Sequence, residues 1–264
     1  QRQMCIRDRL SRTRGRDRRH MKFIPCEDCA LRKMAPFKQF TTPELSYVSA
    51  LKSGQIELPP RTVIIEPGKY DGQLFTLFSG WAYRYRVAPS GLRQIIDVLL
   101  PGSLIGLQQL VLGASDSGVE SLTPVTLCVL QGRSINEIFD DHSKLSSAMV
   151  FALMEDERRA DRRIEMVAKQ SGPERLAYFL LELVDRLQPL GLGNDSMSYF
   201  PLQRRHLADL LGLSDTHVSR SMTELRRDDL ATIGANSLVI RNRAMMTKLS
   251  GYVIGEAEHQ RLLL

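Results

Sequence analysis

Hydrophobic residues between about Glu57 and Gln131 fall in short runs separated by turn signals. The apolar or alternating runs are Val63–Ile65, Leu74–Phe78, Trp81–Val87 and Ile95–Leu99. Proline and glycine lie between the runs, at Pro59 and Pro60, Pro67 and Gly68, and Gly91, where they favour tight changes of chain direction. Short strands joined by close turns predict an antiparallel roll or sandwich.

The pattern changes to a helical one from Asp141 to about Gln170, a stretch without glycine or proline. Positions on one face recur every three or four residues and form a narrow seam: Leu145, Met149, Leu153, Asp156, Ala160, Ile164 and Val167. A helix that packs only on its own domain would give a similar pattern. A long helix with a narrow seam between charged flanks is more typical of a dimer interface, which we expect at Met149–Val167.

A break at Ser171, Gly172 and Pro173 ends this helix and can start the next. Ser171 or Gly172 suits a helix N-cap, and proline suits the first helical position. The following apolar face, from Leu176 to Leu187, predicts a second helix that packs broadly. We therefore expect a sensor domain at 21–171 and a DNA-binding domain at 172–264.

Residues 202–230 have the pattern of a helix-turn-helix. Leu207, Leu210 and Leu211 supply the inner face of a first helix, and small Ala208 allows a second helix to cross closely. Gly212 can adopt the left-handed conformation that ends a helix. Leu213 can fill the angle between the helices, and Ser214 is a good N-cap for the second helix.

The second helix has a polar face suited to reading DNA. Val218, Met222 and Leu225 should face inward, which places Thr216, Ser219, Arg220 and Thr223 on the opposite face. We expect base contacts from Thr216, Ser219 and Arg220, and phosphate contacts from four arginines, Arg204, Arg205, Arg226 and Arg227. Two short apolar runs around Gly234–Ser237 predict a hairpin, the wing. An ordinary helical hairpin with solvated arginines is the alternative.

The net positive charge of the chain does not bear on the predicted domains, because it lies in the first 20 residues. The first 20 residues carry eight arginines and two aspartates, and this net +6 equals the charge of the whole chain. We interpret 1–20 as a disordered or extraneous arm without the apolar stretch of a signal peptide. No apolar run is long enough to cross a membrane. Four cysteines in 264 residues do not suggest a secreted disulfide scaffold, so we expect a cytoplasmic protein.

From about Cys26 to Arg243 the chain resembles the CRP/FNR transcription regulators, named for the cyclic-AMP receptor protein and the fumarate–nitrate reduction regulator. The matching residues are Gly68, Gly80, Gly91, Pro101–Ser103 and Gly106, then 173–176 and 212–220. The resemblance implies an α+β fold, with an N-terminal cyclic-nucleotide-binding-type β-roll, a long dimerisation helix and a C-terminal winged helix-turn-helix. It also implies a homodimer on an inverted repeat of double-stranded DNA, with RNA polymerase as a further partner of an activator.

The resemblance does not imply a cyclic-AMP response. Members that bind cyclic AMP carry Gly-Glu at the pocket and then Arg-Ser/Thr-Ala, in which the arginine pairs with the cyclic phosphate. This chain has Gly106 and Leu107, and then Ser117, Gly118 and Val119. We therefore expect no response to cyclic AMP.

Cys26, Cys29 and Cys128 resemble the cysteines that ligate a [4Fe–4S] cluster in oxygen-sensing members. The third N-terminal cysteine of those proteins is replaced by Ala35, which leaves three thiolates where a cluster normally has four ligands. Asp28, a small molecule or Cys5 could supply the fourth. A cluster or other metal, a thiol–disulfide switch and plain structural cysteines all stay open.

Two regulatory functions and one enzymatic one follow from these observations. The chain could respond to oxygen or redox state, or to another small molecule bound in the roll, such as haem or a metabolite. An enzyme is the third possibility. The five histidines fall in no catalytic pattern and there is no phosphate loop, so we expect no catalysis.

Overall fold

A computed structural model describes residues 24–34, 37, 39–69, 72–130 and 135–253. The arm at 1–20, Ala35 and the last eleven residues lie outside the described residues. The chain divides into two compact units, and the division falls at Val150 and Phe151. This is earlier than the expected boundary at Gly172, because the second half of the long helix packs with the DNA-binding part.

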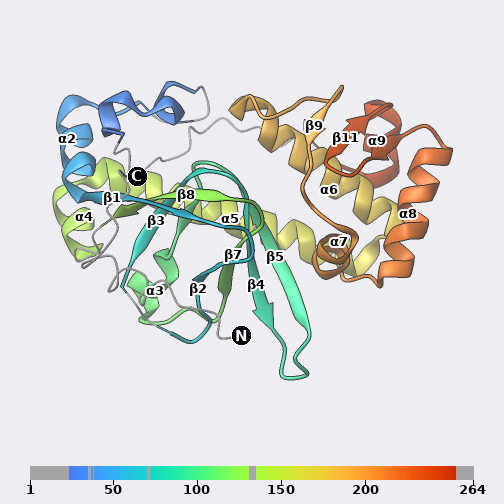
Figure 1. Cartoon of the computed structure of the whole chain (residues 1–264), viewed down its shortest axis with the longest axis horizontal. Coiled ribbons are helices and arrows are strands. Elements are labelled where there is room, and N and C mark those ends of the chain that lie inside the picture. Colours follow the sequence, from blue (N-terminus) through green and yellow to red (C-terminus); the bar gives the residue numbers. More distant parts are fainter. Residues whose placement is uncertain (1–23, 35–36, 38, 70–71, 131–134, 254–264) are drawn as a thin grey trace. The chain divides into compact units, whose positions relative to one another are not determined.

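Antiparallel strands build the first unit, as the turn pattern predicts (Figure 1). Its described strands are β1 (Lys52–Leu58), β2 (Val63–Ile65), β3 (Leu74–Ser79), β4 (Ala82–Val87), β5 (Arg93–Leu99), β6 (Leu104–Ile105), β7 (Gly118–Ser121) and β8 (Val125–Leu130). They form two four-stranded sheets in the orders β1-β8-β3-β6 and β2-β7-β4-β5. All four predicted runs are strands, so the antiparallel roll is confirmed.

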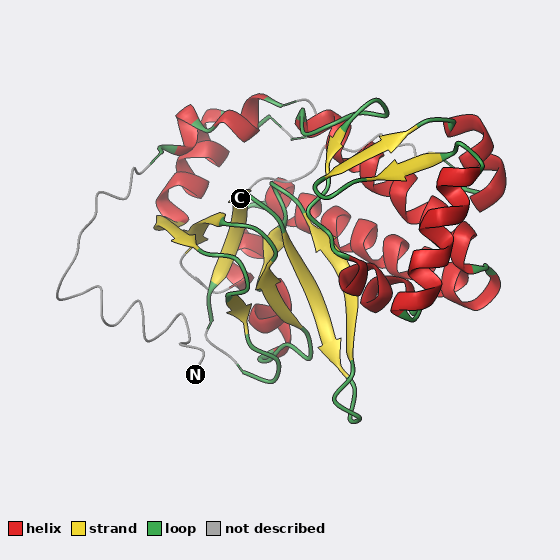
Figure 2. Ribbon diagram, turned by 45° about the vertical axis from the view of Figure 1, so that its right-hand side comes forward, coloured by secondary structure: helices red, strands yellow, loops and turns green. Residues whose placement is uncertain are grey.

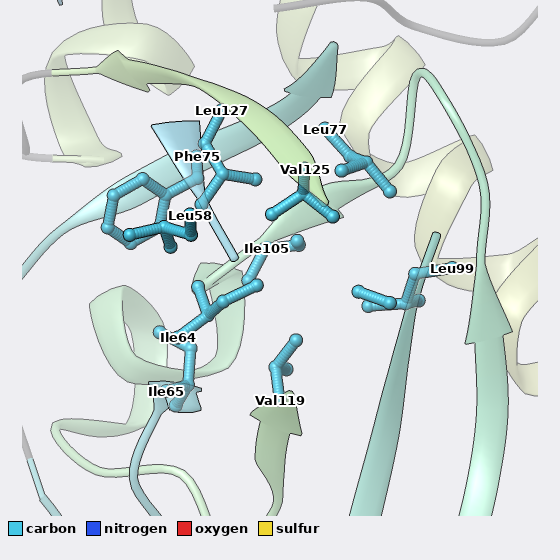
Figure 3. Close-up of a cluster of buried hydrophobic side chains, with 11 residues drawn as sticks. Leu58, Ile64, Ile65, Phe75, Leu77, Leu99, Ile105, Val119, Val125 and Leu127 are labelled. Atoms are coloured by element: carbon cyan, nitrogen blue, oxygen red, sulfur yellow. The ribbon is translucent and has the colours of Figure 1, made fainter. Parts of the chain in front are cut away.

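Both sheets contribute side chains to one apolar core. The first sheet supplies Leu58, Phe75, Leu77, Ile105, Val125 and Leu127, and the second supplies Ile64, Ile65, Ala82, Leu99 and Val119. Figure 3 shows these side chains gathered between the strands. Alternation sends every second residue of β8, Val125 and Leu127, into this core, as expected for a strand with one buried face.

Helices cover part of the roll. They are η1 (Cys26–Asp28), η2 (Ala30–Lys33), α2 (Thr42–Leu51), α3 (Leu107–Leu112) and α4 (Ile135–Asp141). A second apolar cluster joins Val48 and Leu51 of α2 to Leu130 of β8. Leu145 and Met149, from the start of the long helix, belong to the same cluster.

The long helix α5 (Ser143–Lys169) is confirmed. One seam residue needs correction: Met149 is only 1% exposed and packs in the roll's own cluster, so it is not available to a partner. Helix α6 (Gly172–Leu187) begins as expected, with the backbone N–H of Ser171 donating to Glu174 Oε2 at 2.7 Å. Arg163 of α5 pairs with Glu182 of α6 at 3.7 Å, both side chains being nearly buried.

The rest of the second unit is a winged helix (Figure 2). Its elements are η3 (Gln188–Leu190), β9 (Ser198–Tyr199), α7 (Arg204–Leu211), α8 (Asp215–Arg227), β10 (Ala231–Ile233), β11 (Ser237–Ile240) and α9 (Arg243–Ser250). Strands β10 and β11 form the predicted wing hairpin, closed by the Gly234 N–H donating to Ser237 O at 2.7 Å. Pairing of β9 with β11 and the presence of α9 are additions that the sequence pattern did not indicate. Within the described ranges, no helix is both long and apolar enough to span a membrane.

Candidate DNA-binding surface and thiol pocket

The turn between α7 and α8 has the predicted chemistry. Gly212 ends α7 with a φ of 64°, in the left-handed region that glycine tolerates best. The Leu213 N–H donates to Ala208 O at 3.1 Å, which holds the turn against the first helix. Ser214 caps α8, its Oγ accepting from the His217 N–H at 3.3 Å. These contacts set the crossing of the two helices.

Helix α8 buries one face and exposes the other. Val218, Ser221 and Leu225 are buried. Met222, which the periodicity places on the inward side, is partly buried, and Ser221 is buried as well. Ser221 can be buried because its hydroxyl donates to His217 O at 2.9 Å.

The predicted base-reading residues lie together on the outward side of α8. Thr216, Arg220 and Thr223 are exposed, and Ser219 is half-buried. Among the described residues, none forms a hydrogen bond or an ion pair with the Arg220 guanidinium. Such a guanidinium can donate two parallel hydrogen bonds to a base edge without first giving up hydrogen bonds within the protein.

The arginines expected to hold phosphates differ in their surroundings. Arg204 and Arg205 are both exposed at the start of α7. Arg204 Nη1 donates to Ser219 Oγ at 3.1 Å, so this side chain reaches the base-reading residues themselves. Arg205 Nε donates to His206 Nε2 at 3.3 Å and stays at the helix end.

The other two arginines end α8. Arg226 is exposed. Arg227 forms two hydrogen bonds to Asp228, at 2.8 and 3.1 Å, which raise the pKa of Arg227 and lower that of Asp228. The Asp228 carboxylate already neutralises Arg227, so Arg226 is the better phosphate ligand of the two.

Half of the predicted seam on α5 is an exposed apolar stripe. Leu153 is 40%, Ile164 68% and Val167 40% exposed, whereas soluble proteins usually cover such side chains. Asp156 interrupts the stripe and forms an ion pair with Arg159, one turn away in the same helix.

Three cysteines, a close pair before α2 and one in β8, line one small pocket of the first unit. Cys26 and Cys128 are buried, Cys29 is half-buried, and the lining also includes the cationic side chains of Arg32 and Lys52. The sequence pattern did not indicate these two cations. Their positions follow from the packing of the lead-in, residues 24–34, on α2 and β1, where Lys52 Nζ donates to Ile24 O at 2.6 Å.

The surroundings of Cys128 disfavour its thiolate form. Burial raises its pKa, partly offset by Gln55 Nε2, which donates to Cys128 Sγ at 3.4 Å, and by the charge of Lys52. A raised pKa keeps the thiol protonated and weakly nucleophilic near neutral pH. The partly exposed Cys29 is the more accessible sulfur.

The pocket does not fit a [4Fe–4S] cluster. Such a cluster normally takes four ligands, and three thiols are present. Across the residues that the structure describes, no three His, Cys, Asp or Glu side chains are arranged to hold a metal ion. Asp28, the candidate fourth ligand, is exposed and is not part of the pocket lining.

Residues 106–119 correspond to the segment in which cyclic-AMP-binding members carry their pocket residues, and in this chain several of them contact other parts of the protein. Leu107 is buried in the apolar cluster beneath the roll. Ser115 Oγ donates to Ser117 O at 2.9 Å, and a Cβ on Gly118 would lie 2.5 Å from the Tyr85 ring. Residues 106–119 include no lysine or arginine that could pair with a phosphate.

Two family models match the chain: the cyclic nucleotide-binding domain over residues 55–142 and the Crp-like helix-turn-helix domain over residues 174–249. The transcriptional activatory protein AadR of Rhodopseudomonas palustris is 30% identical over 176 residues, which are 66% of this chain and 72% of AadR. The nitrogen fixation regulation protein FixK of Bradyrhizobium diazoefficiens is 24% identical over 202 residues, 76% of this chain and 84% of FixK.

The solved structure of FixK2 from Bradyrhizobium japonicum has the same fold, with a TM-score of 0.67 and 23% identity over 75% of this chain and 98% of that one. The β-roll and the winged helix therefore agree with the two family matches, and the overall fold agrees with the solved structure. On this evidence the chain belongs to the CRP/FNR family of DNA-binding transcription regulators.

Proposed function

We propose that the protein is a homodimeric regulator that binds an inverted repeat, with one α8 in the major groove of each half-site. The observation that carries this proposal is the outward face of α8, which presents Thr216, Ser219 and Arg220 and which Arg204 reaches through its hydrogen bond to Ser219. One recognition helix reads only a half-site, and a two-fold dimer matches an inverted repeat. The proposed activity is regulation without catalysis, in the cytoplasm where bacterial DNA lies.

The exposed stripe on α5 supports a second copy of the chain as the partner. Pairing two α5 helices along Leu153, Ile164 and Val167 would bury apolar surface at a gain of about 25 cal/mol per Å². The interface is a weak one, because Ala160 buries little area and Asp156 lies between the large apolar side chains. A marginal dimer is open to control by a modest coupling free energy of about 1–3 kcal/mol.

We propose that the redox state of Cys26, Cys29 and Cys128 supplies that control. Their shared pocket joins the lead-in to β8, so a bond between the two segments would alter the packing of the roll. Two thiols and one hydrogen peroxide give a disulfide and two water molecules, which is a complete reaction without a metal. The alternative is a small molecule other than cyclic AMP that binds in the roll.

The dimer and its DNA site are tested by sedimentation and by DNA titration. The protein is expected to sediment as a dimer and to bind an inverted repeat more tightly than a single half-site. A monomer with equal affinity for both DNAs would overturn the proposal.

The redox part is tested by repeating the titration after reduction and after mild peroxide treatment. DNA affinity should change in the wild type and not in Cys29→Ser or Cys128→Ser, and peptide mapping should find a disulfide at the pocket. Anaerobic purification with iron and sulfide assays is the control for a cluster. Unchanged affinity in all three proteins would show that the cysteines are structural.

A further inference from the structure

The guanidinium of Arg175 lies among three backbone carbonyl groups at the ends of two other helices. Its Nη2 donates to Val167 O at 2.8 Å and its Nε to Gln170 O at 2.9 Å, both at the end of α5. Its Nη1 donates to Leu211 O, the last residue of α7, at 3.0 Å. All these contacts lie within the second unit.

The three carbonyl groups lie at helix ends, where carbonyl oxygens need hydrogen-bond donors from outside the helix. The last carbonyls of a helix have no N–H within the helix to accept from, and a cation near them is favourable. Arginine suits the place because its N–H groups point in several fixed directions in one plane. A lysine ammonium is a point charge that cannot reproduce this spread of donors.

The first turn of α6 also contacts the recognition helix. A Cβ on Gly172 would lie 2.7 Å from Ser221 Oγ of α8 and 3.5 Å from Leu213, so the backbone at this position approaches the helix-turn-helix closely. Gln170 Nε2 donates to Ser250 O of α9 at 2.8 Å, which joins the end of α5 to the other side of the domain.

We propose that Arg175 is a positioning residue that holds the helix-turn-helix at a set angle to the end of α5, and so sets the half-site spacing that the dimer accepts. The inference rests on the proposed dimer through α5. Half-site spacing follows from the separation and orientation of the two recognition helices. Loss of Arg175 should therefore loosen the angle between α5 and α7 without changing the face of α8 that reads bases.

Arg175→Met removes every hydrogen-bond donor of the side chain and keeps an aliphatic stem. Arg175→Lys keeps the positive charge and is the variant to use if Arg175→Met is unstable. Arg243→Met is the matched control. Arg243 forms ion pairs with Asp185 and, at 2.7 Å, with Asp195. Its loss should lower the melting temperature of the same domain without touching the junction of α5 and α7.

The assay measures affinity of the full-length proteins for a single half-site and for inverted repeats whose spacing changes by one base pair at a time. Wild type and Arg243→Met should prefer one spacing. Arg175→Met should lose about tenfold at that spacing, keep its half-site affinity and respond less to spacing, with Arg175→Lys in between.

Equal losses on the half-site and on every spacing would mean that Arg175 only stabilises the domain, and the inference would be wrong. It would also be wrong if Arg243→Met flattened the spacing preference too, or if both Arg175 variants kept that preference. A monomeric wild type without a spacing preference would overturn the proposed dimer as well.

Discussion

At the scale of single residues, the outward face of α8 divides the work between reading bases and holding phosphates. Arg220 is exposed, and the described residues leave its guanidinium available to DNA. Arg204 lies against Ser219 and belongs to both sets, whereas Arg205 stays at the start of α7.

Arg220→Ala should weaken binding to the preferred site by about 1–3 kcal/mol, because arginine commonly donates two hydrogen bonds to guanine O6 and N7. Relative to the oxygen-sensing members, Ser219 and Arg220 are shared but Thr216 replaces a glutamate, so part of the half-site should differ. Titration of specific and random DNA measures the effect. Equal losses on both would show that Arg220 touches only phosphate.

Arg205→Ala should weaken binding to all sequences similarly and lower the slope of log affinity against log salt by about one. Arg204→Ala should show the same salt effect together with an extra loss on the preferred site, because Ser219 loses the donor that holds its hydroxyl. Salt titrations of the two variants on preferred and random DNA compare them directly. Identical behaviour of both would mean that the Arg204–Ser219 contact has no role in reading bases.

At the scale of elements, α5 combines two roles along its length. Its first part, with Leu145 and Met149, completes the roll, and the part from Leu153 onward carries the exposed stripe. Because Met149 is buried in the roll, fewer apolar side chains of the seam remain for contact with a partner.

Ile164→Glu should break the dimer, because it would bring two carboxylates together at the most exposed apolar position of the stripe. Asp156→Leu should act in the opposite direction and tighten the dimer, and it should make DNA binding less dependent on redox state. Sedimentation at several protein concentrations measures both. A dimer that survives Ile164→Glu would place the interface elsewhere.

At the scale of the whole molecule, the chain matches the cyclic nucleotide-binding domain over residues 55–142, but it lacks the Gly-Glu and Arg-Ser/Thr-Ala motifs of the members that bind cyclic AMP. Buried Leu107 takes the place of the ribose-binding glutamate, and no cation lies in 106–119.

Millimolar cyclic AMP should therefore change neither the melting temperature nor the DNA affinity. A ligand that binds only the folded state stabilises it by about 2.7 kcal/mol at 100 times its Kd, so binding would be easy to detect. Thermal melts over a range of cyclic-AMP concentrations are the measurement, with a known cyclic-AMP-binding regulator as positive control. A saturable rise in melting temperature would contradict this prediction.

Signals that act over a few residues were enough to predict part of the fold. Alternating runs and turn residues placed β2, β3, β4 and β5 of the roll, and Gly212 and Ser214 placed the helix-turn-helix, because caps, turns and side-chain periodicity are local. They did not place β1, β6, β7 and β8. The polar face of α8 follows from the same periodicity. Local signals also have limits: Met149, expected in the dimer seam, is buried in the roll's own cluster, since burial depends on what packs against a residue.

Some contacts between distant residues were visible only in the folded chain. The family resemblance grouped Cys26, Cys29 and Cys128, but it did not indicate that Lys52 lines the same pocket, which follows from the pairing of β8 with β1. Arg175 reaches the ends of α5 and α7 because those helices pack around the first turn of α6. Such contacts come from long-range packing, which leaves no periodic trace in the chain.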